Sequence, residues 1–276
     1  TLQPDVNLAQ EKADAERARL QMTAEAMSDS ERRYVMDQTA ALALRQTEVE
    51  DLDILPKVTL KDVPRDHIYP EPIMTGPVTA YAAGCNGIVY HQLIRELPEL
   101  SEADWRLLPV LNQVAGELGF GGQDYVAAQN LQQSLTGGIS AFASVRASLA
   151  NINQAGTFFV LSSRSLARNA SKMMTLLNET SQGLRFDETA RIAELVRQSN
   201  TRKQMGVVNQ GHSLAMLAAS AAFSKISALN HQLSGLGSLA FFKGLVAKIE
   251  EGDLASLAAD LAGLYARFEQ APQSAM

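Results

Sequence analysis

Residues 78–94 read VTAYAAGCNGIVYHQLI, two β-prone runs separated by the pair Asn86-Gly87. Val, Thr, Tyr and Ile favour extended backbone, and an Asn-Gly pair tolerates the positive φ angles that a tight hairpin turn requires. The stretch therefore predicts a β-hairpin in which residues 78–81 pair with residues 88–94. This hairpin is the expected start of an antiparallel sheet.

The chain that follows the hairpin alternates between helical and strand patterns. Ser101, with Asp104 three residues later, has the form of a helix-capping box, although Pro109 predicts a kink in this helix or a later start. Glycines at 119–122 are expected to end it. The next expected elements are a helix at 125–135 and a strand pair formed by 139–149 and 157–163.

Beyond Arg168 the pattern is entirely helical. Ile192, Leu195 and Val196 would form one apolar face, with Asp187 as the expected cap. Residues 214–229 are so rich in Ala and Leu that we expect them to be buried nearly all round. Two last helices are expected at 239–250 and 254–269. The order strand-strand-helix-helix-strand-strand-helices predicts an α+β fold, an antiparallel sheet with helices packed on one face, and not a doubly wound α/β fold.

The first quarter of the chain has a different composition. Residues 1–75 contain none of the 18 glycines, and residues 1–52 carry 11 acidic and six basic side chains. Two narrow apolar seams at helical spacing, separated by the capping-box sequence Ser28 to Glu31, predict a helical hairpin over 1–52. Such narrow apolar stripes bury little apolar surface, so we expect the hairpin to be stabilised by packing against a larger partner.

A proline-rich connector follows at 53–77, which holds five of the nine prolines. Proline is excluded from helix interiors and central strands, so this segment is expected to be extended, with Val58 and Leu60 available for a short edge strand. The predicted organisation is therefore a helical hairpin linker at 1–52, a connector at 53–77, and one α+β domain at 78–276.

The length, composition and net charge of the chain argue against several classes of protein. The chain has 276 residues, 46% of them hydrophobic, and a net charge of -6, which argues against a protein that works by neutralising nucleic-acid phosphates. No run approaches the roughly 18 apolar residues of a membrane span, and the N-terminus lacks the pattern of an export signal. The single cysteine, Cys85, excludes a disulfide framework and fits a reducing compartment. We expect a soluble protein of the cytoplasm or an organelle matrix, not a secreted one.

Catalytic motifs are weak throughout. The histidines are His67, His91, His212 and His231, none close enough to another to present a metal-binding pair on one helical turn. The sequence from Gly211 to Ala215 is one substitution from a G-x-S-x-G nucleophile elbow. Its nucleophile would be Ser213, but a helical pattern precedes it where an elbow needs a strand, so helix packing is the favoured interpretation.

Three further candidates also have simpler explanations. The glycine-rich run from Gly116 to Gly122 lacks the Gly-Lys-Ser/Thr of a phosphate loop, and helix termination explains it better. Cys85 has no neighbouring base in the sequence that would activate its thiol. The acidic pair Glu250-Glu251 is most simply solvated charge at a helix end. We therefore assign no catalytic, cofactor-binding or metal-binding residue to this chain.

The order of several short segments carries more information than any motif. These segments are EVED at 48–51, LP at 55–56, VTLKDVP at 58–64, NGIVY at 86–90 and TGGIS at 136–140. Together they resemble the middle of presequence-protease-like zinc metallopeptidases of the insulinase (pitrilysin) family. The resemblance extends over nearly the whole chain.

The resemblance implies a parent enzyme of four homologous α+β domains in two halves, joined by a helical hairpin and enclosing a peptide chamber. This chain would be the hairpin plus the third, inactive domain. The family's zinc site, an inverted HxxEH motif, belongs to the first domain, before Thr1. An alignment through Gly119 puts Val110, Gln113 and Val114 at the positions of the two histidines and the glutamate, and none of them can act as the motif requires.

The resulting hypothesis is a non-catalytic piece of a zinc endopeptidase that degrades unstructured peptides. The chain alone is not expected to be catalytic, it holds no cofactor of its own, and zinc is expected in the parent enzyme. Its expected partners are the remaining domains of the same polypeptide and the parent's peptide substrates, not nucleic acid or membranes. The alternative is a free-standing α+β scaffold or binding protein whose helical hairpin is an interaction arm.

Overall fold

The computed structural model describes residues 6–49, 52–66, 69–148, 150–151 and 154–276. The chain divides into two compact units, Thr1–Ile68 and Tyr69–Met276. His67, one of the four histidines considered above, lies outside the described residues. The α+β class predicted from the sequence is confirmed by a second unit that combines one mixed sheet with a layer of helices.

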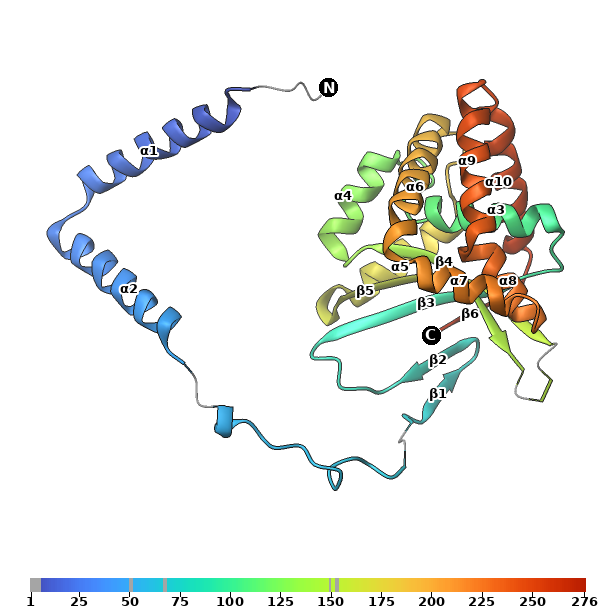
Figure 1. Cartoon of the computed structure of the whole chain (residues 1–276), viewed down its shortest axis with the longest axis horizontal. Coiled ribbons are helices and arrows are strands. Elements are labelled where there is room, and N and C mark those ends of the chain that lie inside the picture. Colours follow the sequence, from blue (N-terminus) through green and yellow to red (C-terminus); the bar gives the residue numbers. More distant parts are fainter. Residues whose placement is uncertain (1–5, 50–51, 67–68, 149, 152–153) are drawn as a thin grey trace. The chain divides into compact units, whose positions relative to one another are not determined.

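The sheet of the second unit has six strands in the order β1-β2-β6-β3-β5-β4 (Figure 1). All neighbouring strands are antiparallel except β2 and β6, which are parallel. The strands are β1 Pro72–Thr75, β2 Val78–Tyr81, β3 Ile88–Glu96, β4 Ile139–Ala147, β5 Ala155–Leu166 and β6 Gln273–Ala275. The predicted pair at 139–149 and 157–163 is therefore confirmed as β4 and β5, with slightly different bounds.

The predicted hairpin of 78–81 with 88–94 is right in its turn and wrong in its pairing. Asn86 and Gly87 have φ angles of 47° and 77°, and the Ile88 amide donates to the Cys85 carbonyl at 2.9 Å. The strands on either side do not pair, however, because β6 lies between them, with Ala275 opposite both Val78 and Leu93. A tight turn reverses the chain, but it does not decide which strand fills the neighbouring position.

The strand β1 lies in the segment predicted as a connector. It pairs with β2 across a turn that contains Gly76, whose φ of 58° is in the left-handed region. Its proline, Pro72, is the first residue of an edge strand, a position that needs no backbone donor. The strand expected around Val58 and Leu60 is absent from the described residues, where both side chains are exposed.

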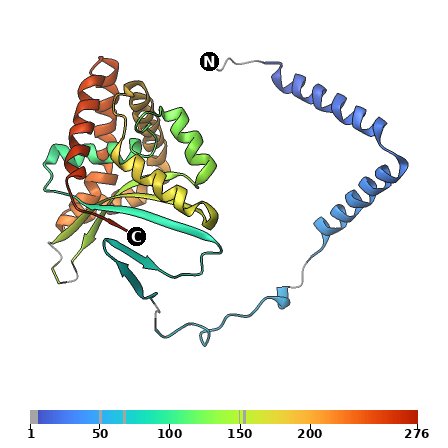
Figure 2. The same ribbon diagram turned by 180° about the vertical axis from the view of Figure 1, so that it is seen from behind.

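Helices cover one side of the sheet, as predicted, and the core lies between the two layers (Figures 1 and 2). The three buried residues predicted for one helical face, Ile192, Leu195 and Val196, all belong to this core. The helices are α3 Glu102–Val114, α4 Tyr125–Leu135, α5 Ala170–Gln182, α6 Thr189–Asn209, α7 Gly211–Ser220, α8 Lys225–Ser234, α9 Leu236–Glu250 and α10 Leu254–Glu269. The α4 and α10 bounds match those predicted.

Helix α3 forms the centre of this layer. Its capping box is present, with the Ser101 hydroxyl accepting from the Asp104 amide and the Asp104 carboxylate accepting from the Ser101 amide. The helix begins at Glu102 and continues through Pro109, so the proline does not delay its start. Packing explains this tolerance, because Leu108 and Val110 on either side of the proline are fully buried.

Two predictions for the C-terminal part are wrong. Residues 214–229 do not form one buried helix but parts of α7 and α8, in which the only buried residue is Leu229. Met216 and Phe223 are instead 69% and 79% exposed. An Ala- and Leu-rich composition favours burial, but only neighbouring elements can cover a helix. The region after Arg168 is also not entirely helical, since it ends in strand β6.

The first unit contains the two helices expected for residues 1–52. They are α1, Leu8–Ala26, and α2, Asp29–Thr47, and the Ser28/Glu31 capping box at the start of α2 is confirmed. A short 3-10 turn, Leu52–Ile54, follows. No residue of α1 or α2 is buried, so the apolar seams of both helices are open to solvent within this unit.

Strand β6 attaches the β1–β2 hairpin to the rest of the sheet, and one substitution tests this. Ala275→Pro removes the amide that donates to the Pro77 carbonyl at 3.0 Å. We expect amide exchange in residues 72–81 to become about tenfold faster, as loss of one backbone hydrogen bond implies. Hydrogen-exchange mass spectrometry measures this. The control Ser274→Ala keeps every backbone donor, and unchanged exchange in Ala275→Pro would contradict the attachment.

A second test concerns the contact between the ends of α3 and α10. Both guanidinium Nη atoms of Arg267 bind the Asp104 carboxylate, which holds the pKa of Asp104 at about 2. Because the folded-state pKa is depressed, the stabilisation is present above about pH 4 and is lost as the pH falls towards 2. Between pH 5 and pH 2.5 the free energy of unfolding, measured with urea, should fall by about 1 kcal/mol less in Asp104→Asn than in the parent sequence. This figure allows for the screening of the ion pair by solvent.

The control for this pH experiment is Glu99→Gln, which removes an exposed carboxylate of the same chain. It should leave the pH dependence close to that of the parent sequence. A pH profile of Asp104→Asn that coincides with the parent's would show that the Asp104–Arg267 contact does not contribute.

Candidate functional site

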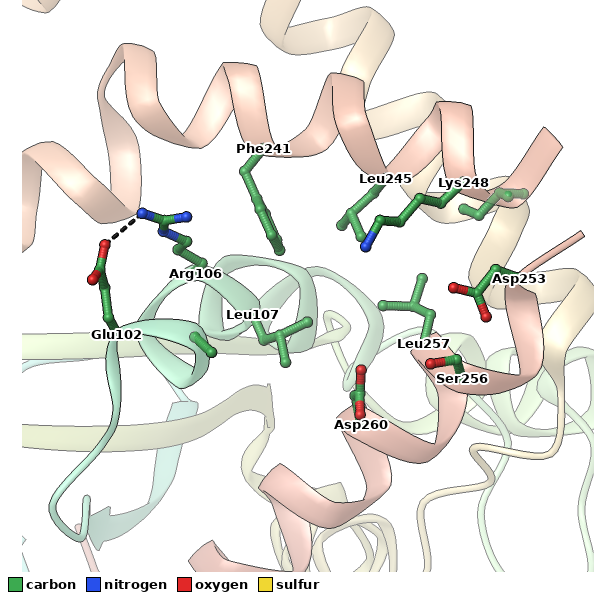
Figure 3. Close-up of a pocket in the computed structure, with 12 residues that line it drawn as sticks. Glu102, Arg106, Leu107, Phe241, Leu245, Lys248, Asp253, Ser256, Leu257 and Asp260 are labelled. Carbon is green, nitrogen blue, oxygen red and sulfur yellow. Dashed lines mark hydrogen bonds and ion pairs between the residues drawn. The ribbon is translucent and has the colours of Figure 1, made fainter. Parts of the chain in front are cut away.

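The main groove of the second unit lies among helices α3, α9 and α10 (Figure 3). Two cavities of about 510 and 610 Å³ make up this groove. They share five lining residues: Glu102, Arg106, Phe241, Leu245 and Lys248. Phe241 and Leu245 point from α9 towards Leu107 of α3, which gives the groove an apolar centre (Figure 3).

The rim of the groove carries charges of both signs. Lys248 lies on one side and Asp253 and Asp260 on another, while Arg106 forms an ion pair with Glu102 (Figure 3). This mixture of a polar rim with an apolar centre is typical of surfaces that hold a polypeptide segment.

The cavity of about 510 Å³ offers no activated nucleophile among the described residues that line it. Ser256 supplies a hydroxyl to the cavity of about 510 Å³, but the described residues that line this cavity include no histidine or cysteine. A serine nucleophile needs an adjacent base to accept its proton, so Ser256 is a polar lining residue.

The positions that the resemblance matched to a zinc motif lie on α3. Val110 and Val114 are fully buried in the apolar core, and Gln113 faces a different cavity, between α6 and α9. Within the part of the chain that the structure describes, no three His, Cys, Asp or Glu side chains come close enough together to hold a metal ion. The helix therefore uses the two valine positions for packing.

The described histidines lie on three separate elements. His91 is buried on β3, where burial lowers its pKa, while His212 is exposed on α7 and His231 belongs to α8. Ser213 lies in the first turn of α7 and follows helix α6, not a strand. The nucleophile-elbow alternative thus lacks the strand on which its geometry depends. Cys85 is half-buried in the turn before β3.

The glycine-rich loop after α3 does bind an oxyanion, but one from its own chain. The Glu188 carboxylate accepts from the Gly119 amide at 2.7 Å and from the Tyr125 amide at 2.8 Å. A Cβ at position 119 would lie 2.3 Å from the Gln123 carbonyl oxygen, so this close approach requires glycine. The loop is therefore a structural clasp between the end of α3, the start of α4 and the start of α6.

Sequence reasoning missed Glu188. It placed the cap of α6 at Asp187, whereas the N-cap is Glu188, which makes no side-chain cap bond and reaches the Gly119 loop instead. The partners lie 69 and 63 residues earlier in the chain. Arg191, one turn later, reinforces the same junction by pairing with Glu117 at 2.8 Å and lying over the Tyr125 ring.

No helix within the described ranges combines the length and apolar character needed to cross a membrane.

Comparison with known proteins defines the class of this chain. Residues 2–245 match the family model of the domain described as associated with peptidases of family M16, subfamily C, and the chain belongs to that family. The presequence-protease-like resemblance inferred from the order of the segments is thereby confirmed.

Individual relatives agree with this assignment. The chain is 26% identical over 263 residues to "Presequence protease, mitochondrial" of Danio rerio, covering 93% of this chain and 25% of that protein. It is 24% identical over 258 residues to "Presequence protease 1, chloroplastic/mitochondrial" of Arabidopsis thaliana, covering 91% of this chain and 24% of that protein. The chain thus spans about a quarter of the length of these relatives.

A solved structure with a related description is the peptidase M16 inactive domain from Pseudomonas fluorescens. The similarity has a TM-score of 0.40 at 16% identity and covers 71% of this chain and 51% of that one.

Glu188 supplies the test of the clasp. Glu188→Ala leaves the amides of buried Gly119 and half-buried Tyr125 without their charged acceptor, so we expect the free energy of unfolding to fall by about 2–4 kcal/mol, measured by urea denaturation. The matched control is Asp187→Ala, which removes the neighbouring exposed carboxylate and its surface pair with Arg185. Equal effects of the two substitutions would contradict the clasp.

Proposed function

We propose that this chain is a non-catalytic, architectural part of a larger M16-type zinc metalloendopeptidase that degrades unstructured peptides. The observation that carries the proposal is the family match, combined with an α3 whose motif positions hold Val110, Gln113 and Val114. The two valines pack in the hydrophobic core, and none of the three side chains is of a type that binds zinc. The zinc and the catalytic base would then come from another part of the polypeptide.

The two units would have separate tasks in this proposal. Residues 1–52 would link and orient the two halves of the enzyme, with 53–77 as connector, and 78–276 would form part of the wall of the peptide chamber. The exposed seams of α1 and α2 support a linking role, because helices that bury nothing within their own unit gain stability by packing on other elements. The greater length of the relatives supports the existence of such elements.

The compartment and partners belong to the same proposal. The relatives named above are described as mitochondrial or chloroplastic, which supports an organelle matrix or, in a bacterium, the cytoplasm. The partners would be the remaining domains of the same polypeptide and its peptide substrates.

The second candidate is a free-standing scaffold protein that uses its helical arm to bind a partner. The specific observation in its favour is the exposure of large apolar side chains on α1 and α2, such as Leu20 at 54% and Met36 at 70%. The reading frame on either side of the coding sequence decides between the two. An upstream HxxEH motif favours the architectural role, whereas a start codon near Thr1 and a stop codon after Met276 favour the scaffold.

The architectural role is tested in the full-length protein by replacing residues 8–47 with a Gly/Ser linker of equal length. We expect peptide cleavage to fall at least tenfold while the zinc content stays unchanged. A Gly/Ser linker can span the same distance, but it cannot hold the two halves of the enzyme in the fixed orientation that closing the peptide chamber requires. Cleavage is measured with a quenched fluorescent peptide, and zinc by atomic absorption.

Unchanged cleavage in that variant would refute the linking role. A separate measurement, zinc analysis of the purified 276-residue chain, should find well below one zinc per chain. Stoichiometric zinc there would refute the non-catalytic assignment itself.

A further inference from the structure

A long stretch of the second unit carries no acidic residue. Residues 195–249 contain neither Asp nor Glu but six basic side chains, in a chain whose net charge is -6. The stretch covers most of α6, all of α7 and α8, and α9 up to its last residue. Its positive potential should attract acidic groups from solution.

Two of these basic residues line a cavity of about 310 Å³ formed by α6, α7 and the start of α9. Lys203 is half-buried, donates to the Ser238 hydroxyl at 3.1 Å and lies 4.9 Å from the centre of the Phe242 ring. Arg202 donates to the Ser199 hydroxyl at 3.4 Å. No carboxylate among the described residues forms an ion pair with either of them.

Burial without a counter-charge has a measurable consequence for Lys203. Desolvation lowers the pKa of its ammonium group. A carboxylate that entered the cavity would supply the missing opposite charge and would raise this pKa again. The Glu188 clasp shows the contrasting case in the same unit, where the donors already have an internal carboxylate.

Part of the lining of this cavity is apolar. Val207, Leu214 and Leu236 line it, and Leu236 is 46% exposed. On α6, the residues that line the cavity are spaced three or four apart between Ser199 and Gln210, so they share one face of the helix. A surface that combines cations in a cavity with apolar side chains around it is complementary to a polypeptide segment that carries both carboxylates and apolar side chains.

We propose that this basic-apolar surface, defined by Arg202, Lys203, Val207, Leu214 and Leu236, docks an acidic polypeptide segment whose carboxylate enters the cavity between Arg202 and Lys203. The inference rests on the proposed architectural function, in which this chain meets other parts of a larger protein. A membrane is disfavoured as the partner because Lys203 is half-buried in a cavity, whereas lipid headgroups require cations that lie open on the surface.

The experiment uses the 276-residue chain and two synthetic helical peptides of about 16 residues, one of Glu and Leu and one with every Glu replaced by Gln. Fluorescence anisotropy at low salt should show the Glu peptide binding at least tenfold more tightly than the Gln peptide. Lys203→Met with Arg202→Gln should remove that difference. Lys243→Met, which removes an exposed lysine of α9 outside the cavity, is the matched control and should leave it unchanged.

The apolar part is tested separately by Leu236→Ser, a position that lines the cavity and is 46% exposed, so a polar residue there does not disturb the core. This variant should weaken the binding of both peptides by a similar factor. Circular dichroism checks that every variant is folded.

Three outcomes would overturn the proposal: equal binding of the two peptides, an unchanged preference in the Lys203/Arg202 variant, or tighter binding to phosphatidylserine vesicles than to the Glu peptide. The last would make the surface a membrane site. None of these measurements involves proteolysis. The docking proposal can therefore be refuted without refuting the architectural function, and the architectural function can be refuted without refuting the docking proposal.

Discussion

The buried guanidinium of Arg95 joins three distant parts of the second unit. Arg95 lies on β3, is 7% exposed, and donates through Nε and Nη2 to the Gln273 side-chain oxygen at 3.1 and 2.8 Å. Its Nη1 donates to the Phe268 carbonyl at 3.2 Å, near the end of α10. A buried charge is tolerated only when its donors are satisfied, so these contacts hold β6 in line beside β3. The β1–β2 hairpin depends on that placement in turn, because β6 is its neighbour in the sheet.

The layer of helices also shows what α3 contributes to the second unit. Helix α3 is fixed at its start by a capping box and by Arg267 of α10, and its middle is core. Of the three positions that the resemblance matched to the zinc motif, two hold buried valines and the third, Gln113, lines a cavity. The face of α3 that carries these two valines therefore stabilises the fold.

Charged groups in the second unit fall into two kinds according to whether their partners are internal. The Glu188 carboxylate joins the Gly119 and Tyr125 amides, and Arg191 pairs with Glu117, so this junction is complete within the chain. Lys203 has a hydroxyl and an aromatic ring but no carboxylate among the described residues. Internal pairing stabilises the fold, whereas a half-buried cation with no counter-charge is better suited to an external partner.

The sequence by itself determined features whose causes act over a few residues. The positive φ angles at Asn86 and Gly87 follow from local sterics, and the capping boxes at Ser28 and Ser101 follow from side chains that reach three residues along the chain. Only the tertiary structure decided that β6, far later in the chain, separates β2 from β3, that Glu188 closes the Gly119 loop, and that α7 stays exposed. These outcomes depend on which distant elements compete for the same hydrogen bonds and the same apolar surface. A local sequence pattern cannot predict the result, because it contains no information about elements far along the chain.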